Sequence, residues 1–460
     1  GIVFEDTEIT AQLAVEAGAD AIHLSAYGDM TSASAFTEGT LPHREAKHAA
    51  LSGRLKKRVT VPVIGVGRIR PETGEEMIGH GKADLIAMGR QMLADPETAQ
   101  KLTENREADI RPCINCYTCV AQPFFDQRVR CAVNPVLANE VELGEIERTK
   151  ASTAKKVVVV GGGPSGMEAA RVAALRGHDV TLLEASDHLG GALRFAALVY
   201  EPNLRLLHWL TGQMDALDID VRTGTPAEAD MIRQLAPDEL IVATGAARER
   251  SALPGADRRL VVDGDDLRAM LTGSGDVRAA LKKLPLAGRI AATVGRRAGL
   301  LDDPGRLAKL TEHYMPIGKR VVIVGGGLVG IELAEFLVDR DREVTVLEEG
   351  PVLATEMAHP RRWRVLTDLR DHGAQLVTGA AVSRIDEKSV SYVVGDDDDG
   401  VASTIEVDSV VIATGLVADE GVADRLRSAG FAPTVVGDCK GVGYLEGAMH
   451  EGFHAGLAVG

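Results

Sequence analysis

The chain has 460 residues, 45% of them hydrophobic, which is enough for about three domains of ordinary size. Its net charge of −16 argues against a nucleic-acid-binding surface and against attraction to an anionic membrane. No apolar run approaches the roughly 20 residues of a membrane-spanning helix, and no secretory signal is visible, so we expect a cytoplasmic protein.

Residues 1–110 alternate short apolar strands with helices, which predicts a parallel sheet with helical crossovers. We expect strands at 21–24, 61–66 and 84–88, and helices at 7–17, at 44–55 and from Pro71 onward. A complete (β/α)8 barrel needs about 250 residues. We therefore expect only the C-terminal part of such a barrel. Because Gly1 lies inside this pattern, we also expect the chain to be a fragment whose first barrel strands are missing.

Two of the predicted strands are followed by a Gly-Arg pair, Gly67-Arg68 and Gly89-Arg90. The loops after the last two strands of (β/α)8 barrels commonly bind a phosphate through backbone N–H groups. The two pairs together predict a phosphate site. For each pair alone, an ordinary surface arginine after a turn glycine is the alternative.

Four of the five cysteines, Cys113, Cys116, Cys119 and Cys131, form a C-x2-C-x2-C-x11-C pattern. Three closely spaced thiolates and a remote fourth are typical of an iron–sulfur cluster. Zinc is the main alternative, although zinc ribbons usually carry two separated C-x2-C pairs, and unligated thiols are a third. Cys439 stands alone, and we expect it to be a small buried residue.

Two nucleotide-binding patterns follow the cysteines. The first has a strand at 157–160, Gly161-x-Gly163-x-x-Gly166, a helix, a strand at 180–183 and Glu184; the second has a strand at 321–324, Gly325-x-Gly327-x-x-Gly330, a helix, a strand at 344–347 and Glu348. In both copies the acid lies 18 residues after the third glycine. Such a loop brings a pyrophosphate close to a helix N-terminus, and the acid accepts hydrogen bonds from a ribose.

Each copy is followed by a strand that ends in Ala-Thr-Gly, at 241–245 and at 410–415. The final stretch contains Gly437-Asp438 and a glycine-rich helix. We therefore expect the first fold to be interrupted by the second and to resume after it. Residues 273–317 are expected to be a packed helical insertion, and 396–399 a solvated turn.

With these motifs in view, the chain resembles the multi-cofactor branch of the old yellow enzyme family, which includes 2,4-dienoyl-CoA reductase, 2-enoate reductases and trimethylamine dehydrogenase. The resemblance is carried by RPCINCYTC with CAVNP, GVGRI, AMGRQMLADP and VVVVGGGPSGMEAA. It implies the end of an FMN barrel at 1–110, a 4Fe–4S segment at 111–151, an FAD domain at 152–262 and 410–460, and an NAD(P)H domain at 263–409. Both nucleotide domains are expected to be Rossmann-like and of the glutathione-reductase type.

The resemblance also implies roles for residues of this chain. The cluster would be ligated by Cys113, Cys116, Cys119 and Cys131, and the FMN phosphate would be bound by Gly67, Arg68, Gly89 and Arg90. The FAD would be bound by Gly161, Gly163, Gly166, Glu184, Thr244 and Asp438. The NADH would be bound by Gly325, Gly327, Gly330 and Glu348. We expect NADH rather than NADPH, because Glu349 follows Glu348 and no arginine is adjacent. Arg340 and Arg342 are expected to point to solvent.

The implied activity is NADH-dependent reduction of a small α,β-unsaturated carbonyl, with catalytic residues in the missing barrel strands and with self-association left open. One alternative is an amine dehydrogenase that passes electrons to a carrier protein. Another is an electron-transfer module for a separate subunit. No C-x-x-C follows the first helix of the FAD fold, which disfavours a disulfide reductase.

Overall fold

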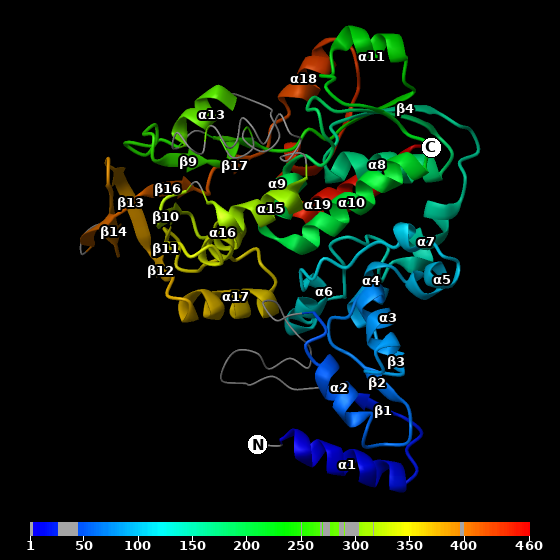
Figure 1. Cartoon of the computed structure of the whole chain (residues 1–460). Helices are drawn as coiled ribbons and strands as arrows, with labels where there is room; N and C mark the ends of the chain where they lie inside the picture. The colour runs from blue at the N-terminus through cyan, green and yellow to red at the C-terminus, as the bar shows by residue number, and fades with distance from the viewer. Residues whose placement is uncertain are drawn as a thin grey trace.

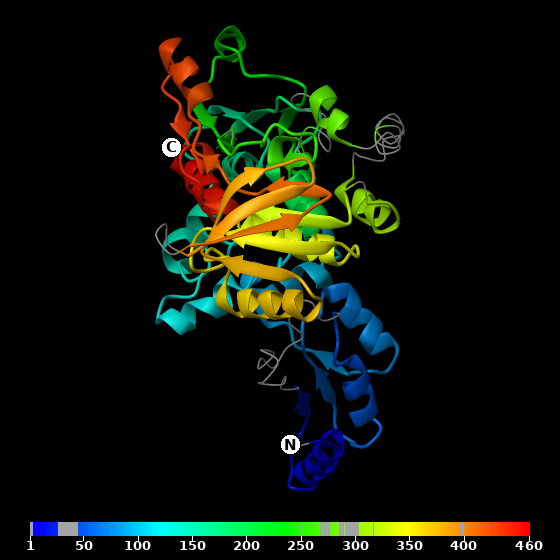
Figure 2. The ribbon, with the colours of Figure 1, turned by 90° about the vertical axis from the view of Figure 1, so that its left-hand side faces the viewer.

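The computed structural model describes residues 3–25, 45–249, 251–266, 269, 277–284, 289, 303–315, 317–395 and 400–460. The expected turn at 396–399 and much of the expected insertion at 273–317 therefore lie outside the described residues. A slender N-terminal lobe projects from a larger body that contains the rest of the chain (Figures 1 and 2).

The N-terminal lobe is a parallel sheet of three strands in the order β1-β2-β3 with helices beside it. Its elements are α1 (Phe4–Glu16), β1 (Ile22–Leu24), α2 (Ala49–Leu55), β2 (Val63–Gly65), α3 (Pro71–Gly79), β3 (Leu85–Ile86), α4 (Gly89–Ala94), α5 (Thr98–Thr103) and η2 (Glu107–Asp109). Leu55 and Val63 are fully buried in its small core. The three expected strands are present, each shorter than predicted.

The cysteine segment coils tightly between this lobe and the body. It contains α6 (Thr118–Ala121), η3 (Gln122–Phe125) and α7 (Glu140–Arg148). Asn115 and Tyr117 adopt left-handed conformations, with φ of 52° and 67°, on either side of Cys116. Left-handed residues bend the chain locally, so the backbone bends on both sides of Cys116.

The first nucleotide-binding domain is built on a parallel five-stranded sheet in the order β18-β7-β4-β5-β6. Its strands are β4 (Lys156–Val160), β5 (Asp179–Leu183), β6 (Asp220–Arg222), β7 (Glu239–Val242) and β18 (Thr434–Val435). Its helices are α8 (Pro164–Leu175), α9 (Ala192–Val199), α10 (Glu201–Ala216), α11 (Ala229–Leu235), α18 (Gly421–Ser428), η4 (Gly437–Cys439) and α19 (Tyr444–Ala458). Glycines of α19 let it approach α8 (Figure 1), because a Cβ at Gly452 would lie 2.2 Å from the Ser165 carbonyl oxygen.

The second domain is inserted into the first and has its own five-stranded sheet in the order β12-β11-β10-β16-β9. Its elements are β9 (Val261–Asp263), α13 (Val277–Lys283), α15 (Pro304–His313), β10 (Arg320–Val324), α16 (Leu328–Val338), β11 (Glu343–Glu348), α17 (His359–Asp371), β12 (Gln375–Thr378) and β16 (Ser409–Ile412), with an antiparallel sheet of β13 (Ala380–Ile385), β14 (Ser389–Val394) and β15 (Val401–Glu406). Residues 261–262 and 410–412, which the sequence assigned to the FAD domain, pair in this sheet.

The two crossings between the domains lie side by side. The outgoing strand β8 (Ala247–Arg248) pairs antiparallel with the returning strand β17 (Leu416–Val417). The glutathione-reductase-like pairing of two Rossmann-type domains after a piece of a barrel is therefore present, and the predicted α/β fold class is confirmed.

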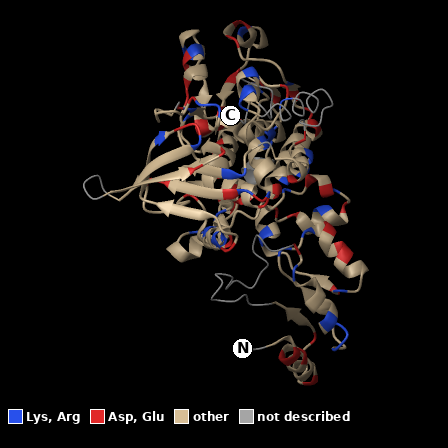
Figure 3. Ribbon diagram, turned by 60° about the vertical axis from the view of Figure 1, so that its left-hand side comes forward, with Lys and Arg blue, Asp and Glu red and all other residues tan. Residues whose placement is uncertain are grey.

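The described part of the chain contains no helix long and apolar enough to cross a membrane. In the view of Figure 3, acidic and basic segments are interspersed along the ribbon rather than separated by sign. Of the expected insertion, α13 and α15 are helical and described.

Candidate cofactor sites

The first glycine loop connects β4 to α8, and two of its glycines are required by the protein fold itself. Gly161 has φ of 109°, and a Cβ there would lie 2.3 Å from the carbonyl oxygen of Ala243. A Cβ at Gly166 would lie 1.9 Å from the carbonyl oxygen of Gly161. Any side chain at either position would therefore separate the strand, the loop and the helix.

Gly163 has no such structural reason to be glycine. Its φ of −76° and ψ of 179° suit any residue, and no atom lies within 4 Å of a Cβ built on it. This space opens directly in front of the first turn of α8, where backbone N–H groups point outward. A dinucleotide pyrophosphate fits that space, so the loop meets the requirements of FAD.

Glu184 lies at the end of β5 and is held rigidly beside the loop. Its carboxylate accepts hydrogen bonds from the backbone N–H groups of Gly162 and Ser186, each at 2.7 Å. Asp438 is half-buried across the site, where burial raises the pKa of its carboxyl above the ordinary value. Its Oδ1 accepts from the Gly443 N–H at 2.9 Å.

These residues line one cavity of about 630 Å³. Gly161, Gly163, Glu184, Thr244 and Asp438 contribute to its walls. The cavity also reaches the cysteine segment at Ile114, Cys116 and Thr118, and the second domain at Leu328, Glu332 and Arg361 of α16 and α17. Its volume lies within the range of cofactor sites in proteins. A ligand held by the first glycine loop could therefore reach the cysteines and the second domain without leaving the cavity.

The four predicted cysteine ligands come close enough to influence one another electrostatically. Burial, and then the neighbouring Cys116 and Cys113, raise the pKa of Cys119 to about 12. Burial and Cys116 likewise raise the pKa values of Cys113 and Cys131. Among the described residues, no three His, Cys, Asp or Glu side chains are arranged to hold one metal ion. A 4Fe–4S cluster does not require that arrangement, because each of its thiolate ligands binds a different iron.

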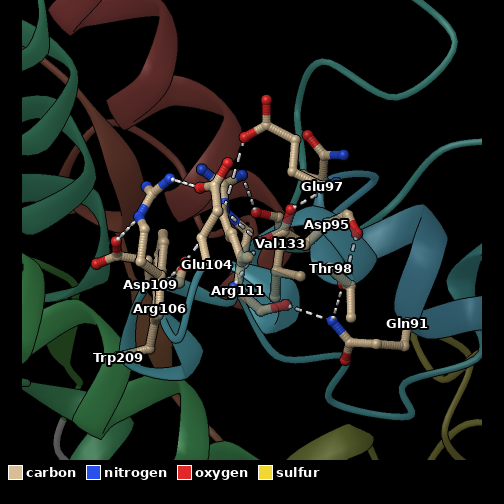
Figure 4. A network of polar contacts seen from close by, with 12 residues as sticks. Gln91, Asp95, Glu97, Thr98, Glu104, Arg106, Asp109, Arg111, Val133 and Trp209 are labelled. Atoms are coloured by element: carbon tan, nitrogen blue, oxygen red, sulfur yellow. Dashed lines mark hydrogen bonds and ion pairs between the residues drawn. The ribbon is translucent and has the colours of Figure 1, made fainter. Parts of the chain in front are cut away.

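Hydrogen bonds that are partly or fully buried hold the start of the cysteine segment against the N-terminal lobe (Figure 4). Gln91 accepts from the Cys113 N–H at 3.0 Å and donates to the Arg111 carbonyl oxygen at 2.9 Å. Asp95 accepts from the Arg111 N–H at 2.9 Å and from Lys101 Nζ at 2.6 Å. These bonds fix the backbone immediately before the first cysteine.

The same segment is fastened to the first nucleotide-binding domain through the side chain of Arg111. It donates to the carbonyl oxygen of Val133 at 2.7 Å and pairs with the fully buried Glu168 of α8 at 3.3 Å. Arg171 also pairs with Glu168, at 2.8 Å, and both guanidinium groups lie over the ring of Trp209. The sequence analysis did not predict this network. Glu168 and Arg171 lie three residues apart in an apolar helix, and this spacing of opposite charges could have indicated a buried ion pair.

The two Gly-Arg pairs predicted to hold a phosphate come together at the base of the N-terminal lobe. The guanidinium of Arg90 lies 4.4 Å from the ring centre of Tyr117. Burial lowers the pKa of Arg68, and the charge of Arg90 acts in the same direction, so the two cations lie near each other. Gly67, with φ of 111°, precedes Arg68 in the turn after β2; Gly89 begins α4. Their role toward FMN stays a prediction.

The second glycine loop repeats the geometry of the first. A Cβ at Gly330 would lie 1.9 Å from the Gly325 carbonyl oxygen, while Gly327 has an ordinary φ of −68°. Glu348 accepts from the N–H groups of Gly326 at 2.6 Å and Gly350 at 2.8 Å. The loop therefore suits a second dinucleotide, with one difference at its mouth.

That difference is Glu356. Its Oε2 accepts from the Leu328 N–H, in the first turn of α16, at 3.2 Å. A Cβ at Gly327 would lie 3.5 Å from its Oε1. A carboxylate therefore occupies the place where the motif predicts a pyrophosphate.

Arg340 and Arg342 do not point to solvent as expected. Arg340 Nη2 donates to the Ala308 carbonyl oxygen at 2.9 Å, and Arg342 Nη2 donates to that of Met315 at 3.1 Å. Both side chains are half-buried against the segment around α15. They precede β11, whereas Glu348 ends it, so neither belongs to the ribose site.

Three known families match parts of the chain. Residues 4–109 match the NADH:flavin oxidoreductase / NADH oxidase family, and residues 205–433 match the pyridine nucleotide-disulphide oxidoreductases. Residues 156–212 match the FAD dependent oxidoreductases. The boundary between the first two matches falls around the cysteine segment, in agreement with the fold.

Individual relatives match nearly the whole chain. An NADH oxidase of Thermoanaerobacter brockii is 33% identical over 98% of this chain and 63% of its own length. A cinnamate reductase of Clostridium sporogenes is 30% identical over 91% of this chain and 56% of its own length. The solved structure of a 2-naphthoyl-CoA reductase complex superposes with a TM-score of 0.83 at 27% identity, over 100% of this chain and 63% of the other. The chain thus spans about three-fifths of the relatives that it matches. It belongs to the old yellow enzyme-like NADH:flavin oxidoreductases, in the multi-cofactor branch that joins a flavin barrel to a pyridine nucleotide-disulphide oxidoreductase unit.

Proposed function

We propose that this chain carries electrons from NADH through FAD and a 4Fe–4S cluster to FMN, for the reduction of a small α,β-unsaturated carbonyl compound in the cytoplasm. When bound, the flavins supply hydride transfer and the cluster supplies single-electron transfer. The names of the relatives, an NADH oxidase, a cinnamate reductase and a 2-naphthoyl-CoA reductase, support this direction of electron flow.

The observation that carries the proposal is the continuity of the cavity from Gly163 to Cys116. The first glycine loop would hold the pyrophosphate, and Glu184 would receive the ribose hydroxyls. The far end of the same ligand would then lie between the cysteine loop and α16. Because Cys116 lies on the wall of the same cavity, the distance between the two redox groups would be short.

The direct test follows reduction by NADH without oxygen. We expect the flavin absorbance near the FAD maximum to bleach first, followed by the electron paramagnetic resonance signal of a reduced cluster. An NADH-treated protein with reduced flavin and no cluster signal would contradict this order. If the second glycine loop bound no nicotinamide nucleotide, the amine-dehydrogenase alternative would be favoured instead.

Cofactor choice should favour NADH over NADPH by roughly tenfold or more in kcat/KM. Glu348 ends β11 beside the predicted ribose, Glu349 follows it, and a 2′-phosphate would meet two like charges. The substitution Glu348→Gln keeps an acceptor for the Gly326 N–H and should narrow the preference. Steady-state kinetics with both nucleotides check this; equal kcat/KM values in the unaltered protein would refute it.

Neutralising Glu356 should lower the KM for NADH by roughly threefold to tenfold, because its carboxylate competes with the pyrophosphate for the first turn of α16. Glu356→Gln removes the charge with little change of shape. Glu343→Gln, at the exposed opposite end of β11, is the matched control. Stopped-flow titration of flavin reduction against NADH separates affinity from rate. A KM that rises in Glu356→Gln would show that this carboxylate assists binding.

A further inference from the structure

Arg361 of α17 is a buried cation that none of the predicted sites accounts for. Its side chain is 4% exposed and lines the same cavity as Gly163 and Cys116. Nη1 donates to Glu332 Oε1 of α16 at 2.6 Å, and Nη2 lies 3.7 Å from Glu335 Oε2. Burial opposes its charge, but Glu332 and the other neighbours keep the pKa of Arg361 above its ordinary value, so the guanidinium stays protonated.

The hydrogen-bonding capacity of Arg361 is not used up by the protein. Among the described residues, neither Nε nor Nη2 has a hydrogen-bond partner, and both atoms are buried. A buried guanidinium N–H without an acceptor is strongly unfavourable, because desolvation is not repaid. Both N–H groups are covered by protein atoms and do not face the cavity, so Arg361 can act on a molecule in the cavity through its charge, which little water screens.

Contacts on the other face of Arg361 fix it in place. Its guanidinium lies over the ring of Tyr200 with 4.1 Å to the ring centre. The buried Tyr200 hydroxyl lies 3.0 Å from the carbonyl oxygens of Ile114 and Asn115 and shares its proton between them. The ring of Trp363, also on α17, packs edge-on against Phe124, at 5.6 Å. Helix α17 thus contacts the cysteine segment directly through Trp363 and indirectly through Tyr200, and Arg361 lines the cavity beside that segment.

We propose that Arg361 tunes the FAD: its buried positive charge at the cavity wall favours the reduced, more negative state of the flavin ring. The inference rests on the proposed function, because it requires FAD in the cavity. A guanidinium suits this task, since it remains charged when buried. Glu332 partly offsets this charge and so sets how strongly it acts.

The test is the midpoint potential of the FAD, measured by anaerobic spectroelectrochemistry. In Arg361→Gln the ratio of reduced to oxidised FAD at a fixed potential should fall about tenfold, which is about 30 mV for a two-electron couple. Arg361→Lys keeps a positive charge, so it should lower the midpoint potential less than Arg361→Gln does. Glu332→Gln should move the potential in the opposite direction, because it leaves the Arg361 charge unopposed. A purely structural role would not produce shifts of opposite sign.

The matched control is Arg362→Gln, since Arg362 is the next residue of α17 and its Nε donates to the Leu353 carbonyl oxygen at 2.7 Å. The midpoint potential of the FAD in Arg362→Gln should equal that in the unaltered protein. If Arg361→Gln does not fold, the Arg361→Lys and Glu332→Gln potentials decide. If Arg361→Lys and Glu332→Gln both bind FAD with unshifted midpoint potentials, the inference about Arg361 is wrong, whereas the proposed function still stands. Protein without FAD would instead overturn the proposed function.

Discussion

Replacing Cys116 with alanine should abolish the iron–sulfur cluster and stop electrons from reaching FMN, while NADH still reduces FAD. Protein purified without oxygen should contain about four irons and four sulfides per chain, and Cys116→Ala should contain less than about one. The expected effect is large because Cys116 lies at the centre of the segment: its charge influences Cys113, Cys119 and Cys131, and it lines the cavity.

Cys439→Ala is the control for this experiment. Cys439 is fully buried, as expected, and its Sγ donates to the Val436 carbonyl oxygen at 3.1 Å. Iron and sulfide analysis, with visible spectra, should show no loss in this variant. Stoichiometric zinc without sulfide in the unaltered protein would contradict the assignment of an iron–sulfur cluster.

The parts of the site that the sequence predicted are those set by local backbone geometry. Gly166 is required by its contact with the Gly161 carbonyl oxygen, within a single strand–loop–helix unit, and the turn needs the positive φ of Gly161, so the spacing of the two glycines is readable from the chain. The same holds for Glu184 and Glu348, each of which bonds to its own glycine loop. The fold class followed from these units and from the strand–helix alternation before the cysteines.

The residues that join the units could not be predicted, because their partners lie far apart in sequence. Tyr200 contacts Ile114, 86 residues earlier, and Arg361 contacts Tyr200 from a different domain. Neither pairing leaves a periodic or spaced pattern. Arg342 was misplaced for the same reason: its carbonyl partner at Met315 belongs to a segment whose packing no local rule specifies.

The exact boundaries of the two domains could not be predicted from the sequence for a related reason. Residues 410–412 pair with β10 of the second sheet, and the hydrophobic run that contains them fits a buried strand of either domain. Only the crossing of β8 and β17 decides where the chain returns to the first domain. That crossing is a long-range pairing of two short strands with no turn between them.

Replacing Gly163 with valine should release FAD, with a loss of affinity of at least about 100-fold, or about 2.7 kcal/mol. The structure makes this variant unusually informative. The backbone of Gly163 suits valine, and no protein atom lies within 4 Å of the added Cβ, so the fold should persist. The two methyl groups would instead enter the space in front of α8 that the pyrophosphate requires.

Gly212→Val is the matched control, because Gly212 is an exposed helical glycine of α10 whose added Cβ also meets nothing within 4 Å. Flavin content after gel filtration and the thermal midpoint of each variant check both parts of the argument. We expect Gly163→Val to be folded and free of FAD, and Gly212→Val to be folded and yellow. If Gly163→Val retained FAD at unaltered affinity, the pyrophosphate would not pass this loop, and the cavity that joins it to Cys116 would need another occupant.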